Sequence, residues 1–202
     1  FKKNKYFYPA VISRGYKSKI DTEKQKPQIV TDANNFILFG DEPCLIFMKT
    51  RVPVCVGANR KQALSVLLKD HPKTNLILLD DGFQQKTLTS DKKILIFDDR
   101  FFGNNCCLPY GPMREKWPTN YKIDFFVFNT IKDTKEEIKK NILFDGNEKI
   151  EISTIKPLCW KNLKGETLSL EKMYRLATKY NVTQKNKLYA VAGIGYPEKF
   201  FS

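Results

Sequence analysis

Two neighbouring stretches, NLILLDDGF at residues 75–83 and KKILIFDDRFF at residues 92–102, share one pattern that decides the fold class. Each is a continuous apolar run of strand length that ends in a pair of aspartates. Continuous runs, unlike alternating ones, are typical of strands covered on both faces, as in the parallel sheets of α/β proteins. The two stretches therefore predict parallel strands whose carboxyl ends carry acidic side chains.

The rest of the chain supplies more elements of the same kind. Strands are expected over residues 9–12, 51–56, 123–130, 148–156 (an edge strand) and 187–195. Helices are expected over residues 61–69, 132–140 and 170–180. A further helix starts at GDEP (40–43), after the short apolar run 36–39, and Asp41 suits its N-cap. Residues 156–169 indicate a linker or a hairpin. The pattern predicts an α/β fold with a mostly parallel sheet flanked by helices.

Composition narrows the class of protein. A chain of 202 residues can bury a core, and no stretch reaches the roughly 18 to 20 apolar residues of a membrane-spanning helix. The formal charge of +13 comes mainly from lysine, whereas nucleic-acid recognition favours the bidentate guanidinium of arginine. We therefore expect no nucleic-acid partner. The positive charge favours phosphate-bearing ligands and an anionic membrane surface.

Ligands of open parallel sheets bind beyond the carboxyl ends of the strands. Charged side chains follow the apolar runs at these positions: Arg14, Asp41, Arg60, Asp80, Asp81, Asp98 and Arg114. Carboxylates for Mg²⁺, cations for the phosphoryl group and a base for the attacking hydroxyl are what phosphoryl transfer requires.

Each of these residues taken singly also has a structural explanation. LILLDD is typical of a Walker B strand, but an aspartate also caps the turn after many strands, and the same form recurs at Asp98 and Asp99. Asp41 alone is more often a helix cap, and Arg114 alone is more often a solvated loop residue. GIG at 193–195 can form an anion-binding nest, yet G-x-x-x-x-G-K-[ST] is missing from the sequence, which argues against an ATP-dependent enzyme.

Seven motifs in order add more than any one of them: VISRGY (11–16), GDEP (40–43), PVCVGANR (53–60), LLDDGFQ (78–84), FGNN (102–105), LPYGPMRE (108–115) and AGIGYPEKFF (192–201). Together they resemble the tetraacyldisaccharide 4'-kinase family, the lipid A 4'-kinases of Gram-negative bacteria. The resemblance implies a P-loop NTPase fold followed by a second α/β domain, at the cytoplasmic face of the inner membrane. It also implies transfer of the ATP γ-phosphate to the 4'-hydroxyl of the lipid A precursor, a tetraacyldisaccharide 1-phosphate.

The resemblance further implies ATP and Mg²⁺ as cofactors and roles for single residues. Asp80 and Asp81 match the Walker B pair that holds Mg²⁺, which makes Asp98 the secondary case. Asp41 matches the general base. The other matches are Glu42 and Arg114 for catalysis, and Arg14, Arg60, Gln84 and Glu115 for binding of substrate or phosphate.

The sequence also departs from the family. Lys17 and Ser18 stand where SRGY usually continues with Gly and Arg, and Gln85 stands where a histidine is common. Asn105 and Tyr110 replace a glycine and a small residue. The family's Walker A loop and membrane-binding helix lie upstream of SRGY, and the histidine that orients the catalytic aspartate lies downstream of AGIGYPEKFF. Since none of the three is present here, we expect this stretch alone to be inactive.

We accordingly expect an incomplete kinase core over residues 1–155, a linker and helix over 156–187, and the start of a truncated C-terminal domain over 188–202. Two alternatives stay open. One is a non-catalytic module that binds phospholipid or polyanion through its basic edge and ignores nucleotide. The other is a P-loop NTPase whose acceptor is not a lipid.

Overall fold

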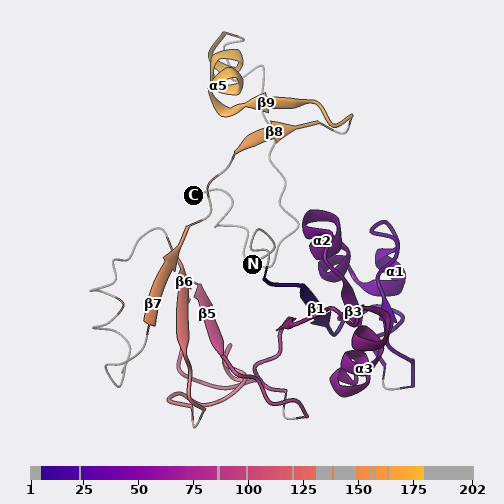
Figure 1. Cartoon of the computed structure of the whole chain (residues 1–202). Helices are drawn as coiled ribbons and strands as arrows, with labels where there is room; N and C mark the ends of the chain where they lie inside the picture. The colour runs from indigo at the N-terminus through magenta and orange to yellow at the C-terminus, as the bar shows by residue number, and fades with distance from the viewer. Residues whose placement is uncertain are drawn as a thin grey trace. The chain divides into compact units, whose positions relative to one another are not determined.

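The chain divides into two compact units, Phe1–Ser153 and Thr154–Ser202, drawn in Figure 1. The computed structural model describes residues 6–22, 24–85, 87–98, 100–119, 121–130, 138, 149–154, 156, 158–162 and 164–179. The helix expected over 132–140, except Ile138, and the strand and GIG turn expected after residue 180 lie outside these residues. The predicted subdivision of the C-terminal part therefore stays a prediction.

A four-stranded sheet in the order β2-β3-β1-β4 forms the first half of the larger unit. Its strands are β1 (Pro9–Ser13), β2 (Gln28–Ile29), β3 (Val54–Val56) and β4 (Leu76–Leu79). β1 runs parallel to both β3 and β4, and only the short β2 is antiparallel. The parallel strands therefore end at one edge, as the sequence predicts.

Helices cover both faces of this first sheet. α1 (Phe36–Phe39) and α2 (Asp41–Thr50) belong to a core cluster with Val11, Val54 and Val56. α3 (Arg60–Asp70) packs through Ala63 and Leu67 on the opposite face. The alternation of β1 residues between the two clusters explains why its apolar run is continuous.

A second, fully parallel sheet has the order β5-β6-β7, with β5 (Ile94–Asp98), β6 (Phe125–Asn129) and β7 (Lys149–Ser153). β7 lies at its edge, in agreement with the sequence. One face packs in an aromatic cluster that includes Phe97, Phe126, Phe128 and Trp117. The smaller unit holds the antiparallel hairpin β8 (Cys159–Lys161) and β9 (Thr167–Ser169), followed by α5 (Leu170–Lys179).

The apolar run 36–39, to which the sequence assigns no element, is the short helix α1. Two expectations need correction. The N-cap of α2 is Gly40, because Asp41 is already its first helical residue. The runs at β4 and β5 are not covered on both faces: Leu78, Ile94 and Ile96 are 41%, 53% and 67% exposed. Each of these strands lies at a sheet edge, and no described helix covers the face that holds these side chains.

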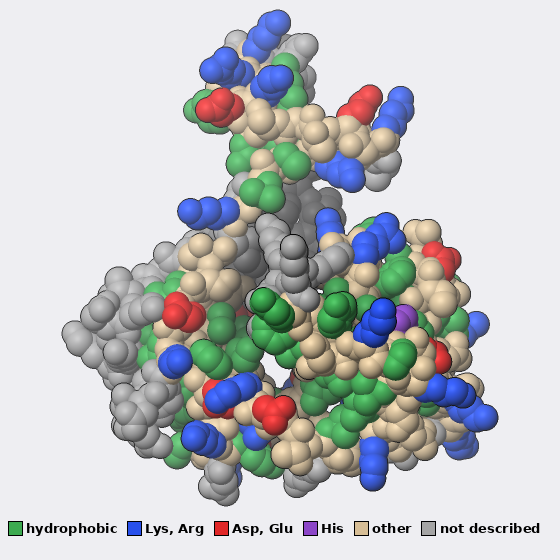
Figure 2. Space-filling model, in the orientation of Figure 1, with side chains coloured by type: hydrophobic (Ala, Val, Ile, Leu, Met, Phe, Trp, Pro, Cys, Tyr) green, Lys and Arg blue, Asp and Glu red, His purple; other side chains and the backbone are tan. Residues whose placement is uncertain are grey.

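The positive charge is spread over the visible surface of the protein. Figure 2 shows Lys and Arg side chains scattered over the visible face, with apolar side chains between them and no continuous basic stripe. Within the described part of the chain, no helix has both the length and the apolar character needed to cross a bilayer.

Candidate functional site

The turn after β4 carries the two aspartates of LLDDGF at the carboxyl edge of the first sheet. The Asp80 N–H donates to the Ile12 carbonyl of β1 (2.9 Å), so Asp80 continues the strand pairing by one residue. Asp81 has a left-handed backbone (φ +45°), and a Cβ on Gly82 would lie 2.5 Å from Leu79 Cβ. Only glycine fits at position 82 of this sharp turn.

Asp81 is held by the loop that follows β5. Arg114 Nη1 donates to Asp81 Oδ1 (2.6 Å) and Oδ2 (2.8 Å), a contact between residues 33 apart in sequence. This hydrogen bond and the charge of Asp81 raise the pKa of Arg114 above its usual value. Next to Arg114, Glu115 Oε1 accepts from Gln84 Nε2 at 3.5 Å. The structure therefore brings four predicted site residues together: Gln84, Asp81, Arg114 and Glu115.

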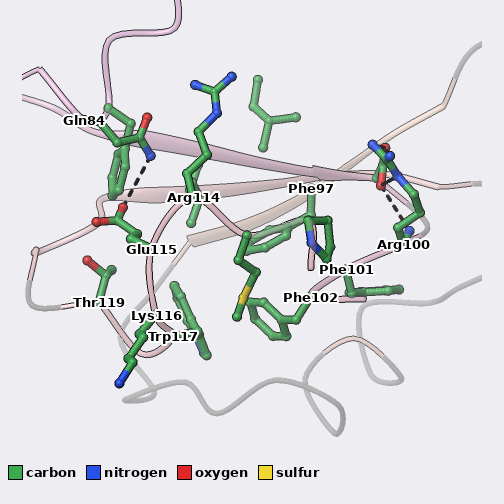
Figure 3. A pocket seen from close by; sticks show the side chains of 16 residues that line it. Gln84, Phe97, Arg100, Phe101, Phe102, Arg114, Glu115, Lys116, Trp117 and Thr119 are labelled. Carbon is green, nitrogen blue, oxygen red and sulfur yellow. Dashed lines mark hydrogen bonds and ion pairs between the residues drawn. The ribbon is translucent and has the colours of Figure 1, made fainter. Parts of the chain in front are cut away.

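Gln84, Arg114 and Glu115 of this group line a cavity of about 260 Å³ beside β5, whereas Asp81 does not. Figure 3 shows the Arg114 guanidinium extending away from the aromatic side chains of Phe102 and Trp117, which line the cavity. Asp98 lies elsewhere along the lining, in an ion pair with Arg100 (Nη2 to Oδ2, 2.6 Å). Asp98 thus has a local basic partner of its own.

A second group of predicted residues surrounds the start of α2. Asp41 and Glu42 are its first two residues, and both are exposed. The pKa of Glu42 is raised because its carboxyl is partly desolvated and because the charges of Asp80, Asp41 and Asp81 lie nearby. The electrostatic coupling links the GDEP carboxylates to those at the end of β4.

Arg60 is the most unusual of the predicted residues. It is 4% exposed, its Nη1 donates to the Gly57 carbonyl (2.7 Å), and its buried Nε has no hydrogen-bond partner among the described residues. Burial, followed by the nearby charge of Arg14, lowers the pKa of Arg60, while Asp80 and other acidic groups act in the opposite direction. A buried cation with an unused donor is suited to bind an anion.

Arg14 lies in the SRGY turn after β1, and its side chain is 59% exposed. Its Nε donates to Asp21 Oδ1 (2.6 Å), and Asp21 Oδ2 also accepts from the Lys17 N–H (3.0 Å). The turn at Lys17, where the sequence departs from the family, is therefore closed by an aspartate. The charges of Arg14, Asp80 and Asp81 all act on Arg60, so the two arginines lie near these carboxylates.

The oxygen ligands at this edge fit a hard divalent cation. Among the described residues, no group of three or more His, Cys, Asp or Glu side chains could hold a metal ion alone. Mg²⁺ usually takes only one or two carboxylates and fills its other positions with water and phosphate oxygens. Asp80 and Asp81 would supply such carboxylates, with Oδ2 of Asp80 bonded to Ser13 and both oxygens of Asp81 contacting Arg114 in this structure.

The chain matches a known protein family over nearly its whole length. The sequence model of the family described as "Tetraacyldisaccharide-1-P 4'-kinase" matches residues 2–202. The chain belongs to this family.

Relatives named tetraacyldisaccharide 4'-kinase extend the match. The protein of Herminiimonas arsenicoxydans is 34% identical over 198 residues, which are 97% of this chain and 52% of the relative. That of Hamiltonella defensa is 35% identical over 95% of this chain and 50% of the relative, and that of Francisella novicida is 34% identical over 96% and 56%. The chain thus spans about half the length of these tetraacyldisaccharide 4'-kinases.

The fold of the tetraacyldisaccharide 4'-kinase family is present as well. The crystal structure of "apo" form LpxK from Aquifex aeolicus in complex with ATP matches 92% of this chain, and 65% of its own, with a TM-score of 0.56 and 19% identity. The predicted α/β, P-loop NTPase-like class is confirmed.

Sequence reasoning missed Ser13, which directly precedes Arg14 in the SRGY motif. Its side chain is buried, with 2% of the residue exposed, and contacts Asp80. The one available signal was its position at the end of an apolar run, where a buried polar side chain needs a partner.

Proposed function

We propose that the protein to which this chain belongs is an ATP-dependent lipid kinase of lipid A biosynthesis. It transfers the γ-phosphate of ATP to the 4'-hydroxyl of a tetraacyldisaccharide 1-phosphate. The observation that carries the proposal is that the carboxylates of GDEP and LLDD lie near Arg14, Arg60 and Arg114 at one sheet edge. Family membership supports the choice of acceptor.

In the proposed reaction the 4'-hydroxyl oxygen bonds to the γ-phosphorus, and the bond from that phosphorus to the β–γ bridging oxygen breaks, so ADP leaves. Asp41 accepts the hydroxyl proton, and Glu42 adds negative charge beside it. Arg60 and Arg114 offset charge on the transferred group. Asp80 and Asp81 hold Mg²⁺, which when bound neutralises part of the triphosphate charge. Arg14 binds a phosphate of the lipid, and Gln84 and Glu115 position the loop carrying Arg114.

The proposed partner surface is the anionic cytoplasmic face of the bacterial inner membrane, where the lipid acceptor resides. Leu45 and Met48 are 50% and 45% exposed and lie one and two turns after Asp41, on the same face of α2. Phe36 and Ile37 of α1 are also exposed. Apolar side chains next to the proposed base suit an acceptor that carries acyl chains, and the net charge of +13 suits anionic lipid.

The test is ATP-dependent phosphorylation of the disaccharide lipid by the full-length gene product. We expect Asp41→Asn and the double variant Asp80→Asn/Asp81→Asn to lose at least about a hundredfold in kcat, as for removal of a general base or of a metal-binding group. Full activity in both variants would overturn the assignment. Lipid binding that is indifferent to Mg²⁺-ATP, with no turnover, would favour the non-catalytic binding module instead.

A further inference from the structure

Ser13 lies next to Asp80 because of the strand register. β1 and β4 are parallel, with Ile12 opposite Leu79, so the next residue of each strand, Ser13 and Asp80, also face each other. The Ser13 hydroxyl donates to Asp80 Oδ2 at 2.8 Å. Ser13 is 2% exposed, so this bond is shielded from water on the serine side. A hydrogen bond from a buried hydroxyl to a carboxylate is charge-assisted and directional.

The bond leaves the carboxylate half used. Oδ2 of Asp80 accepts from Ser13, and among the described residues no side chain bonds to Oδ1. Asp81 is different, since Arg114 contacts both of its oxygens. The Asp80 carboxylate is therefore fixed in rotation by one oxygen, while the other is available to a ligand.

The Ser13 hydroxyl also contacts the turn that follows it. It accepts from the Gly15 N–H at 3.4 Å, and Gly15 has a left-handed backbone (φ +70°). A Cβ on Gly40 would lie 3.2 Å from Gly15 Cα, so the turn packs directly against the residue that precedes Asp41. The Ser13 hydroxyl thus contacts both the end of β4 and the turn whose backbone packs against the start of α2.

We propose that Ser13 is a positioning residue for Asp80: its hydroxyl fixes the carboxylate so that Oδ1 faces the divalent cation. The inference rests on the proposed role of Asp80 as a metal ligand. Ser13 touches neither cation nor substrate, so its effect is on metal affinity through Asp80. Outer-shell partners of ligating carboxylates commonly account for 10- to 100-fold in metal affinity.

The experiment measures Mn²⁺ binding to the full-length gene product by electron paramagnetic resonance, with ADP present, and the Mg²⁺ concentration that half-saturates phosphotransfer. We expect Ser13→Ala to weaken Mn²⁺ binding about tenfold and to raise the half-saturating Mg²⁺ concentration equally. Ser13→Cys keeps the shape but offers only a weak donor, so it should behave like Ser13→Ala. Ser13→Thr keeps the hydroxyl and should restore binding to within about threefold of wild type.

The matched control is Thr130→Val. Thr130 is also 2% exposed and follows a parallel strand, β6, but it lies on the other sheet. Equal Mn²⁺ affinities in wild type, Ser13→Cys and Thr130→Val, at equal melting temperature, would overturn the inference. If Ser13→Ala fails to fold, the comparison of Ser13→Cys with Ser13→Thr decides. A positioning role predicts weaker Mn²⁺ binding in Ser13→Cys, which keeps only a weak donor, than in Ser13→Thr, which keeps the hydroxyl. A packing role does not predict that Mn²⁺ binding follows the strength of the donor.

Asp80→Asn separates this inference from the function on which it rests. If Asp80→Asn abolishes Mn²⁺ binding while Ser13→Cys leaves it unchanged, the Ser13 inference fails and the proposed metal site stands. If Asp80→Asn leaves Mn²⁺ binding unchanged, the metal role of Asp80 is wrong and the inference falls with it.

Discussion

The guanidinium of Arg114 sits on the carboxylate of Asp81, with Nη1 2.6 Å from Oδ1 and 2.8 Å from Oδ2. Both side chains are 58% exposed, so solvent screens the ion pair and its net stabilisation is small. The ion pair matters because the Arg114 guanidinium contacts both carboxylate oxygens of Asp81, which is a proposed metal ligand. In the proposed mechanism, a divalent ion bound by Asp81 would compete with Arg114 for these oxygens, and the released Arg114 would then be available to the transferred phosphoryl group.

Replacement of Arg114 should therefore have opposite effects on binding and on catalysis. Without nucleotide, Arg114→Gln should strengthen Mn²⁺ binding about threefold, because an exposed pair is worth up to about 1 kcal/mol. The same variant should lose about 10³-fold in kcat, as arginines that stabilise phosphoryl-transfer transition states do. Arg100→Gln is the control, since Arg100 makes a similar 2.6 Å pair with Asp98. Arg114→Gln with kcat within twofold of wild type would contradict the prediction.

Arg60 should contribute to function but little to stability. Its guanidinium is buried without an ion pair among the described residues, and Arg60→Met exchanges this desolvated cation for an apolar chain. Loss of the hydrogen bond to the Gly57 carbonyl should lower the free energy of unfolding by about 1 to 2 kcal/mol, whereas breaking a paired buried charge costs about 3 to 5 kcal/mol. Urea denaturation and kcat/KM for ATP test this, with Lys61→Met as the exposed control on α3. A loss above about 3 kcal/mol would show that Arg60 is structural.

Glu42 predicts an unusual pH dependence of stability. Its pKa is raised above the ordinary 4.5, so between that value and the folded-state pKa the native protein binds more protons than the unfolded chain. Over this window the contribution of Glu42 to stability falls as pH rises, and the penalty is fully present above the folded-state pKa. Glu42→Gln should therefore be more stable than wild type at neutral pH, and the difference should vanish at pH 4. Urea denaturation across pH 4–8 measures it, and parallel curves for both proteins would refute the assignment.

The apolar face beyond Asp41 predicts membrane binding by α2. Leu45→Ser/Met48→Ser should weaken partitioning onto phosphatidylglycerol vesicles about thirtyfold, because each side chain loses about 1 kcal/mol of apolar transfer energy. Both residues are exposed, so the fold should persist. Leu68→Ser is the matched control, since Leu68 is a 38% exposed leucine on α3. Vesicle cosedimentation in which all three proteins bind equally would exclude this face.

Much of the fold and part of the site follow from sequence alone, for identifiable reasons. Continuous apolar runs ending in Asp80 and Asp81 predict a parallel strand and its acidic end, because both depend on residues adjacent in the chain. The contact of Arg114 with Asp81 could not be derived this way, since the loop geometry that brings residues 33 apart together leaves no local pattern. The motif order supplied those residues but not the contact.

Errors at the other positions also have physical causes. Asp41 has the chemistry of an N-cap, but Gly40 (φ +94°, ψ 153°) adopts a conformation that glycine alone tolerates readily and takes that position. Ser13 gave only a weak signal, its position at the end of an apolar run, because a serine there is as often a turn residue as a hydrogen-bond partner of a carboxylate. The exposure of Ile94 and Ile96 depends on which elements lie over the sheet, which an apolar run does not encode.

The contact between Gly15 and Gly40 packs together two motifs that are far apart in the sequence, SRGY and GDEP. A Cβ on Gly15 would lie 2.6 Å from the Phe39 carbonyl oxygen, so no side chain separates the SRGY turn from the start of α2. The backbone of the turn therefore packs directly on the residue before Asp41, so a side chain larger than glycine at position 15 or 40 would change the spacing between the proposed base and the turn that carries Arg14.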